Sequence, residues 1–118
     1  MRLTLNELAL LVHQANAKWW MDPLTGDLID RNKGELLCLI HSEISEAMEG
    51  ERKDLMDDHL PNRRMAEVEL ADALIRILDY AAGFGYDIQG AFEDKMAFNS
   101  NRKDHTHAAR KKPGGKKF

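Results

Sequence analysis

The chain has 118 residues and a formal net charge of −3, a size that suits one domain with a hydrophobic core and is too short for two independent domains. Hydrophobic residues make up 43% and charged residues 31%, as in soluble globular proteins, and no apolar run approaches the ~20 residues of a membrane span. The single cysteine, Cys38, excludes an intrachain disulfide and a site with several thiolates, so we expect a cytoplasmic protein.

The charge is distributed unevenly along the chain. Residues 103–118 hold six Lys or Arg and one acidic residue, which leaves residues 1–102 strongly acidic. An acidic body argues against specific binding to nucleic acid and leaves carboxylates that can hold metal ions. We therefore expect residues 1–102 to form the folded domain and residues 103–118 to form a basic, disordered tail.

Helical periodicity begins near the start of the chain, and no segment has the alternation of a convincing strand. Thr4 and Glu7 have the spacing of a capping box, and an apolar stripe continues from there to Trp20. The first helix is expected over residues 4–20. The turn-forming residues 22–27 follow it and end it.

Three further helices are expected between the glycine and proline residues, over residues 33–49, 62–82 and 88–102. Gly50 is expected to stop the second of them, and Asp87 is expected to cap the last. Four helices with short connections predict an all-α, four-helix-bundle-like subunit.

The third expected helix is unusually apolar. Of residues 70–82, ten of 13 are apolar or aromatic. A helix on one side of a small bundle needs more polar surface than this. The helix is therefore either central in the subunit or covered on its far side by a partner subunit.

Two glutamates of the second helix lie on or beside its apolar face. On a helical wheel, Glu43 falls inside the arc of apolar side chains and Glu46 falls at its edge. A carboxylate in such a place costs free energy unless it is paired or bound to a metal ion. Two interpretations of Glu43 stay open here: a metal ligand, or a buried glutamate paired with Arg or Lys.

The few polar residues of the third helix fall within one narrow arc: Glu69, Asp72, Arg76 and Asp79. The ordinary explanation is a stripe that faces solvent. The alternative is that the stripe faces Glu43 and Glu46 across a cleft. Both helices space their acidic residues i, i+3, so two facing pairs would give four carboxylates, ligands suited to Mg²⁺ or Mn²⁺.

The fourth helix carries a polar face of a different kind. Lys95, Asn99 and Arg102 stand at i, i+4 and i+7, hence on one side of the helix. Taken alone, they are best explained as a solvated face near a helix C-terminus. Beside a site with four carboxylates and a metal ion, however, two cations and an amide favour phosphate binding.

These motifs together resemble those of a known family. Glu43-Ile44-Ser45-Glu46, followed after 22 residues by Glu69-Leu70-Ala71-Asp72, resembles the Glu-x-x-Glu and Glu-x-x-Asp signature of the all-α nucleoside triphosphate pyrophosphohydrolases of the MazG type. Gly85-Tyr86-Asp87-Ile88, Lys95 and the Asn99-x-x-Arg102 pair resemble that family's third motif. The similarity covers about residues 33–104.

The resemblance implies hydrolysis of a nucleoside triphosphate to a monophosphate and diphosphate, in control or housecleaning of the nucleotide pool. It implies a homodimer or a dimer of dimers. It also implies Mg²⁺, with Mn²⁺ as a substitute, held by four carboxylates: Glu43, Glu46, Glu69 and Asp72. Phosphates would be bound by Lys95, Asn99 and Arg102. Glu43 and Glu46 would be the catalytic carboxylates, and we expect Glu46 to orient or deprotonate the attacking water.

A nucleoside substrate also needs contacts to its base. Trp19 and Trp20 are candidates, because an aromatic ring can stack on any base, and Asn16 could add a polar contact. Trp19 continues the apolar stripe of the first helix and is better explained as a core residue. The stripe explains Trp20 less well, which makes Trp20 the better candidate.

Two other functions fit the same residues. The substrate could be a different phosphoanhydride, such as a phosphoribosyl-nucleotide. The chain could also form a non-catalytic helical oligomer that binds nucleotide or protein. A ferritin-like di-iron bundle is disfavoured, because the sequence contains no Glu-x-x-His pair.

Overall fold

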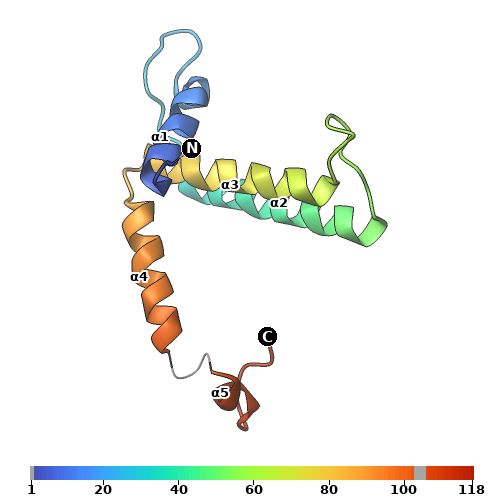
Figure 1. Ribbon diagram of the computed structural model, residues 1–118. Coiled ribbons are helices and arrows are strands. Elements are labelled where there is room, and N and C mark those ends of the chain that lie inside the picture. Colours follow the sequence, from blue (N-terminus) through green and yellow to red (C-terminus); the bar gives the residue numbers. More distant parts are fainter. Residues whose placement is uncertain (1, 103–105) are drawn as a thin grey trace. The chain divides into compact units, whose positions relative to one another are not determined.

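The computed structural model describes residues 2–102 and 106–118 (Figure 1). Within these residues the regular elements are helices, and β-pairing is limited to two isolated bridges, Met21 with Leu28 and Met56 with Arg64. The prediction of an all-α chain is confirmed. None of the described helices combines the length and apolar character that crossing a membrane requires.

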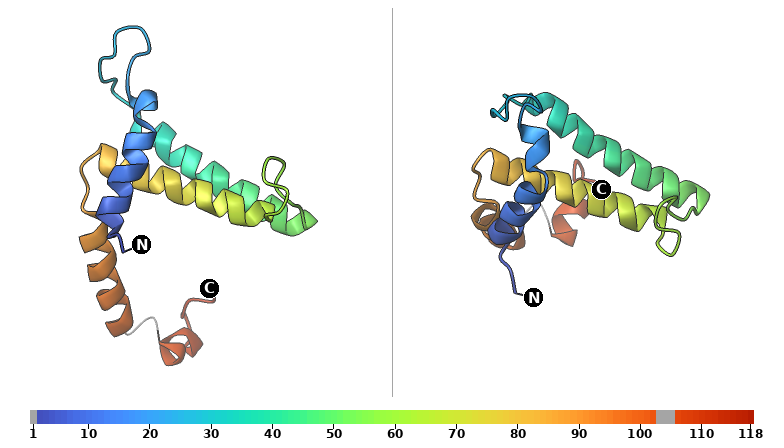
Figure 2. Two further views of the ribbon diagram at one scale, coloured as in Figure 1. Left: turned by 45° about the horizontal axis from the view of Figure 1, so that its top comes forward. Right: turned by 90° about the horizontal axis from the view of Figure 1, so that it is seen from above.

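The chain divides into two compact units, residues 1–86 and 87–118, and each is described by itself. The first unit contains helix α1 (Leu5–Ala15), the short 3₁₀ helix η1 (Ala17–Trp20), α2 (Lys33–Lys53) and α3 (Met65–Gly83). Helices α2 and α3 lie side by side and antiparallel, and α1 packs against α3 (Figures 1 and 2). This pairing places the acidic residues of α2 opposite those of α3.

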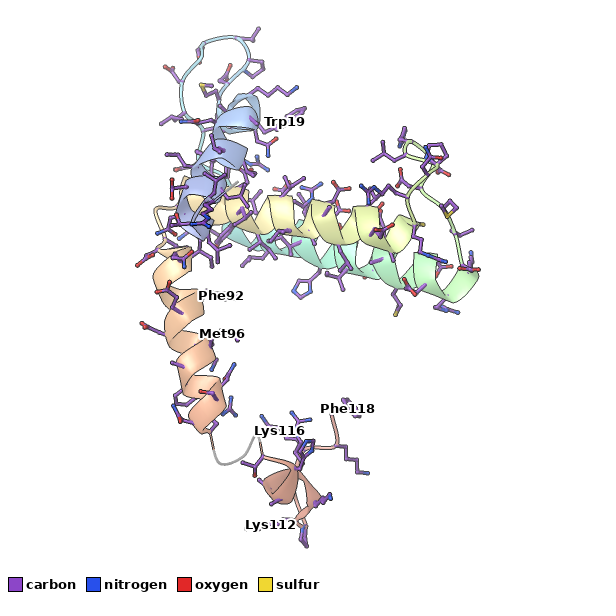
Figure 3. The ribbon with its side chains drawn as sticks, viewed as in Figure 1. Trp19, Phe92, Met96, Lys112, Lys116 and Phe118 are labelled. Carbon is purple, nitrogen blue, oxygen red and sulfur yellow. The ribbon has the colours of Figure 1, made fainter. Side chains whose placement is uncertain are left out.

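Helix α1 begins as predicted but ends earlier. The Glu7 backbone N–H donates to Thr4 Oγ1 and the Thr4 N–H donates to Glu7 Oε1, both at 3.1 Å, which confirms the capping box. The expected single helix to Trp20 is wrong, because α1 ends at Ala15 and η1 follows. The side chain of Trp19 then points away from the ribbon (Figure 3), and that of Trp20 is buried.

Helix α2 does not stop at Gly50. It continues to Lys53 and ends at Asp54, whose φ of +52° is left-handed, a conformation that Asp tolerates better than most residues. Gly50 instead lies against the start of α3, where a Cβ atom on residue 50 would be 2.9 Å from Met65 Cβ. The glycine therefore permits a close approach of two helices.

Helix α3 begins at Met65, three residues later than expected, where the Arg64 N–H donates to Glu67 Oε1 at 3.1 Å. The core of the first unit is built mainly from small side chains on three helices together with two large ones, and it comprises Ala9, Trp20, Ala47, Ala66, Ala73, Leu78 and Ala81. Small residues let the helix axes come close. The larger aliphatic residues Leu70, Leu74 and Ile77 of α3 are exposed.

The second unit contains α4 (Ile88–Asn101) and α5 (His107–Lys111). Asp87 caps α4 as predicted, because its Oδ1 accepts from the Gly90 N–H at 2.9 Å. Helix α5 lies in the segment for which we expected a disordered tail, and residues 103–105 of that tail are outside the described residues. The packing of a fourth helix into a bundle stays a prediction.

Candidate metal centre and adjoining pocket

Three carboxylates from two helices meet between α2 and α3. One oxygen from each of Glu43, Glu69 and Asp72 lies within 4.8 Å of the other two. Glu43 on α2 and Glu69 on α3 are only 8% and 9% exposed. Of the polar stripe on α3, Glu69, Asp72 and Arg76 therefore lie against Glu43 of α2, whereas Asp79 contacts His13 and Trp20.

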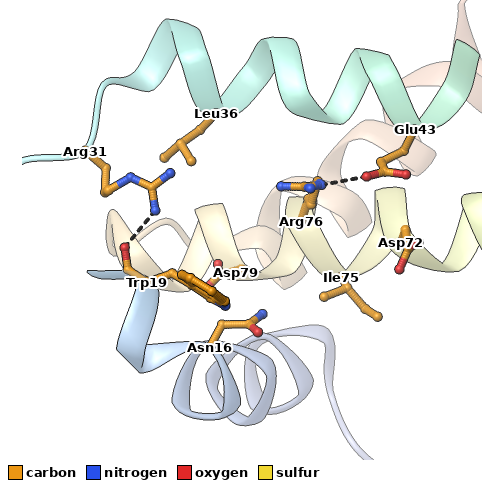
Figure 4. Close-up of a pocket in the computed structure, with 9 residues that line it drawn as sticks. All are labelled: Asn16, Trp19, Arg31, Leu36, Glu43, Asp72, Ile75, Arg76 and Asp79. Atoms are coloured by element: carbon orange, nitrogen blue, oxygen red, sulfur yellow. Dashed lines mark hydrogen bonds and ion pairs between the residues drawn. The ribbon is translucent and has the colours of Figure 1, made fainter. Parts of the chain in front are cut away.

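Arg76, one turn after Asp72 on α3, belongs to the same group. Its Nε donates to Glu43 Oε1 at 2.9 Å (Figure 4). The pairing of Glu43 with an arginine is therefore confirmed. Glu43 is also a member of the acidic triad formed by Glu43, Glu69 and Asp72, and its role as a metal ligand stays a prediction.

The proximity of the carboxylates changes their protonation. The hydrogen bond to Glu43, burial, and the neighbouring Glu46 raise the pKa of Glu69 from its ordinary 4.5 to about 8. Burial acts to raise the pKa of Glu43, but hydrogen bonds with Glu69 and Arg76 and the charge of Arg76 lower it overall. Burial and the charge of Glu43 raise the pKa of Asp72. At neutral pH the triad therefore retains a proton on Glu69.

One atom of the triad is left without a partner. Glu69 Oε2 is buried and accepts no hydrogen bond from the described residues. A buried carboxylate oxygen in this state costs free energy. A hard divalent cation would offset that cost, and a set of ligands made only of carboxylate oxygens suits Mg²⁺ or Mn²⁺. The residues present therefore fit the ion that the sequence motifs imply.

The fourth expected ligand, Glu46, stands apart from the triad. It is exposed and is not among the three residues whose oxygens converge. It still lies close enough for its hydrogen bond and its charge to raise the pKa of Glu69, after the larger effects of Glu43 and burial. Its roles as a metal ligand and as a catalytic carboxylate stay predictions.

A pocket of about 440 Å³ adjoins the triad (Figure 4). Residues of η1, α2, α3 and the segments that connect the helices line it, namely Asn16, Trp19, Arg31, Leu36, Glu43, Asp72, Ile75, Arg76 and Asp79. Glu43 and Asp72 lie at one end, and Trp19, Asn16 and Asp79 lie toward the other (Figure 4). Asn16 and Trp19, two of the expected base-binding residues, are therefore brought to the same cavity as Glu43 and Asp72.

The exposure of the two tryptophans is the reverse of what was expected. Trp19 is 61% exposed at the pocket, so its assignment to the core is wrong, whereas Trp20 is 7% exposed and belongs to the core. The Trp20 Nε1–H donates to both carboxylate oxygens of Asp79 at 3.1 Å. His13 Nδ1 lies 2.7 Å from Asp79 Oδ1. These contacts fix η1 against α3, which also positions Trp19.

Arg31 is a pocket residue that the sequence argument missed. Its Nη1 donates to the Trp19 carbonyl at 2.8 Å, and its guanidinium lies 5.7 Å from the centre of the Trp20 ring. Because Arg31 lies outside the regular helices, helical periodicity gave no signal for it. The cluster of Trp19, Trp20 and Arg31 within one short segment was the only available hint.

The expected phosphate-binding residues belong to the second unit. Lys95 and Arg102 both lie over the ring of Phe98, at 4.8 and 5.6 Å from its centre. Asn99 Oδ1 is buried and has no hydrogen-bond partner among the described residues. The three residues thus follow the C-terminal half of α4 and its C-cap, and a meeting with the carboxylates of the first unit stays a prediction.

Comparison of the chain with protein-family models, curated proteins and solved structures found no match. The similarity to the MazG-type pyrophosphohydrolases therefore depends on the motifs quoted above. The functional argument depends on the acidic triad, the unpartnered oxygen of Glu69 and the adjoining pocket.

Proposed function

We propose that the chain is a Mg²⁺-dependent nucleoside triphosphate pyrophosphohydrolase that acts on the cytoplasmic nucleotide pool. It would convert a (deoxy)nucleoside triphosphate and water to the monophosphate and diphosphate. The observation that supports this most is the buried, unpartnered Oε2 of Glu69 within a triad of carboxylates, beside a pocket of about 440 Å³. A cation site next to a cavity with aromatic and cationic walls suits a phosphorylated, aromatic ligand.

Each group of residues has a separate task in this proposal. Glu43, Glu69 and Asp72 hold the ion, which when bound supplies Lewis-acid chemistry and makes water more acidic. Glu46, exposed beside Glu69, accepts the proton of the attacking water. Trp19 stacks on the base and Asn16 hydrogen-bonds to it.

The residues of α4 and its C-cap would balance the negative charge of the phosphates. Lys95, Asn99 and Arg102 would bind phosphate oxygens and stabilise the departing diphosphate. Lys95 and Asn99 lie in the C-terminal half of α4 and Arg102 is its C-cap, and the two cations share the ring of Phe98. This step needs α4, from the same chain or from a second copy, to meet the triad.

Release of diphosphate from a panel of natural and modified nucleoside triphosphates in the presence of Mg²⁺ tests the proposal. Glu69→Gln and Asp72→Asn should each reduce turnover by about a hundredfold or more, since even the outer partners of metal ligands contribute about 10–100-fold. Glu49→Gln is the matched control, because Glu49 lies on the same α2 helix as Glu43 but pairs with Lys53 at 2.8 Å. It should retain activity.

The outcomes separate the proposal from its alternatives. Turnover of phosphoribosyl-nucleotides in place of nucleoside triphosphates would assign a different phosphoanhydride substrate. Tight nucleotide binding without products would assign a non-catalytic binder. Full activity of both Glu69→Gln and Asp72→Asn would overturn the assignment of the triad.

We also propose that a second copy of the chain covers the outer face of α2 and α3. Five large apolar residues at helical spacing are exposed there: Ile44 and Met48 on α2, and Leu70, Leu74 and Ile77 on α3. Several large apolar residues exposed at helical spacing on two neighbouring helices are typical of a subunit interface. A homodimer or a dimer of dimers would bury it.

A further inference from the structure

Arg76 lies between the acidic triad and the pocket. Its Nε donates to Glu43 Oε1 at 2.9 Å, yet 41% of its side chain stays exposed. It also lines the pocket, together with Trp19 and Asn16 (Figure 4). The guanidinium therefore has both a partner in the triad and access to the space where a ligand would lie.

The pairing of Arg76 with Glu43 offsets negative charge between α2 and α3. Glu43 and Asp72 are acidic residues in close contact, and Arg76 is the cation that the structure places against them. A divalent ion on the same carboxylates would supply more positive charge and would repel the guanidinium. Arg76 and the ion therefore compete for Glu43.

A displaced Arg76 would have a suitable partner within reach. Its long side chain lines a pocket that also borders the carboxylates. A guanidinium presents five N–H donors in a planar fork that matches phosphate oxygens. Once the metal ion neutralises Glu43, an anion bound beside the ion would attract the guanidinium of Arg76.

We propose that Arg76 exchanges partners, binding Glu43 in the metal-free protein and a phosphate group of the ligand once the carboxylates hold a divalent ion. This inference rests on the proposed function for the metal ion and the phosphate. It adds a phosphate-binding residue to the same unit as the triad, in addition to the cations of α4.

A purely structural role for Arg76 makes the opposite prediction. If Arg76 only orients Glu43 for the ion, its removal weakens metal binding. If Arg76 competes with the ion, its removal strengthens metal binding and weakens binding of the anion that follows. The sign of the change in metal affinity separates the two roles.

The experiment titrates wild-type protein, Arg76→Met and Arg76→Lys with Mn²⁺ alone, followed by inorganic pyrophosphate at saturating Mn²⁺, by calorimetry. A neighbouring charge changes the affinity of a carboxylate for a proton by about tenfold to a thousandfold. We expect Arg76→Met to bind Mn²⁺ about tenfold more tightly than the wild type. We expect it to bind pyrophosphate about tenfold more weakly, since it loses charge-assisted hydrogen bonds. Arg76→Lys keeps the charge and should stay close to the wild type for Mn²⁺.

Arg31→Met is the matched control for the charge change. Arg31 lines the same pocket, but it donates to the Trp19 carbonyl rather than to a carboxylate. Its loss should leave the affinity for Mn²⁺ unchanged. An equal gain in Mn²⁺ affinity in Arg31→Met would overturn the inference, because the effect would then come from the general charge of the pocket.

The remaining outcomes distinguish this inference from the proposed function. Weaker or unchanged Mn²⁺ binding by Arg76→Met, or unchanged pyrophosphate binding, would overturn the partner exchange and leave the metal site intact. Failure of the wild-type protein to bind Mn²⁺ would instead overturn the proposed function at its metal site. Thermal unfolding of each variant in a chelator confirms that the fold is retained.

Discussion

The proton on Glu69 connects the stability of the first unit with the chemistry of its site. Glu69 is buried beside Glu43, and its pKa is raised to about 8 by the hydrogen bond to Glu43, by burial and by Glu46. The folded, metal-free protein thus holds a proton at neutral pH that the unfolded chain has released. A metal ion must displace this proton before it can bind all three carboxylates.

We predict that metal-free protein loses stability as the pH rises from about 4.5 to about 8. A raised pKa in the folded state contributes stability below the unfolded pKa, and this contribution is lost as the pH rises through the folded pKa. Thermal unfolding in a chelator measures the effect. Glu69→Gln should remove most of this pH dependence, because glutamine carries no titrating proton.

Glu67→Gln is the control for this pH series, because Glu67 is an exposed carboxylate on the same helix. Its pH dependence should match that of the wild type. Saturating Mg²⁺ should flatten the slope, since the metal-bound protein has already released the proton of Glu69 and unfolding then releases no further proton in this pH range. A flat pH profile for metal-free wild-type protein would contradict the assignment of the proton to Glu69.

At the scale of the helices, local sequence patterns predicted which segments form helices better than they predicted where each helix ends. The capping boxes and apolar arcs act within one or two turns, so the start of α1 and the cap of α4 could be predicted from the sequence. The end of α1 could not, because Asp79, far along the chain, binds Trp20 and so fixes η1 against α3. Gly50 was misread for the same reason, since its neighbour Met65 lies on another helix.

The close approach of α2 and α3 at Gly50 can be tested by substitution. Alanine favours a helix over glycine by at most about 1 kcal/mol, so Gly50→Ala would be stabilising if Gly50 lay in an open helix. A Cβ atom there would instead lie 2.9 Å from Met65 Cβ, and over-packing typically costs about 1–3 kcal/mol. We therefore predict a net loss in the free energy of unfolding, measured by denaturant titration.

Gly34→Ala provides the contrast on the same helix. Gly34 is exposed, and a Cβ atom there would lie 3.3 Å from the Oδ1 atom of Asn32, the N-cap residue of α2, which accepts from the Glu35 N–H at 2.9 Å. This contact is with one side-chain atom and no helix backbone, so this variant should lose less stability than Gly50→Ala. Equal stabilisation by Gly34→Ala and Gly50→Ala would show that α2 and α3 do not approach closely at Gly50.

For the whole molecule, the sequence predicted the acidic triad but not the pocket. Glu43, Glu69 and Asp72 lie on regular helices, so their faces follow from spacing, and two polar arcs can meet in few ways. Arg31 and the exposed position of Trp19 depend on an irregular segment and on η1. The placement of α4 relative to the first unit depends on how the two units assemble, which spacing within a helix does not determine.

The outer face of α2 and α3 leads to the last prediction, that the chain is oligomeric. Leu74→Glu should dissociate it, because in a symmetric interface each copy would bury the new charge against the other. Light scattering coupled to gel filtration measures the mass of each species. Leu24→Glu changes an even more exposed leucine in the segment between η1 and α2, away from this face, and should keep the wild-type mass. If the wild-type chain is a monomer at micromolar concentration, the exposed face has no second copy to cover it and the prediction is wrong.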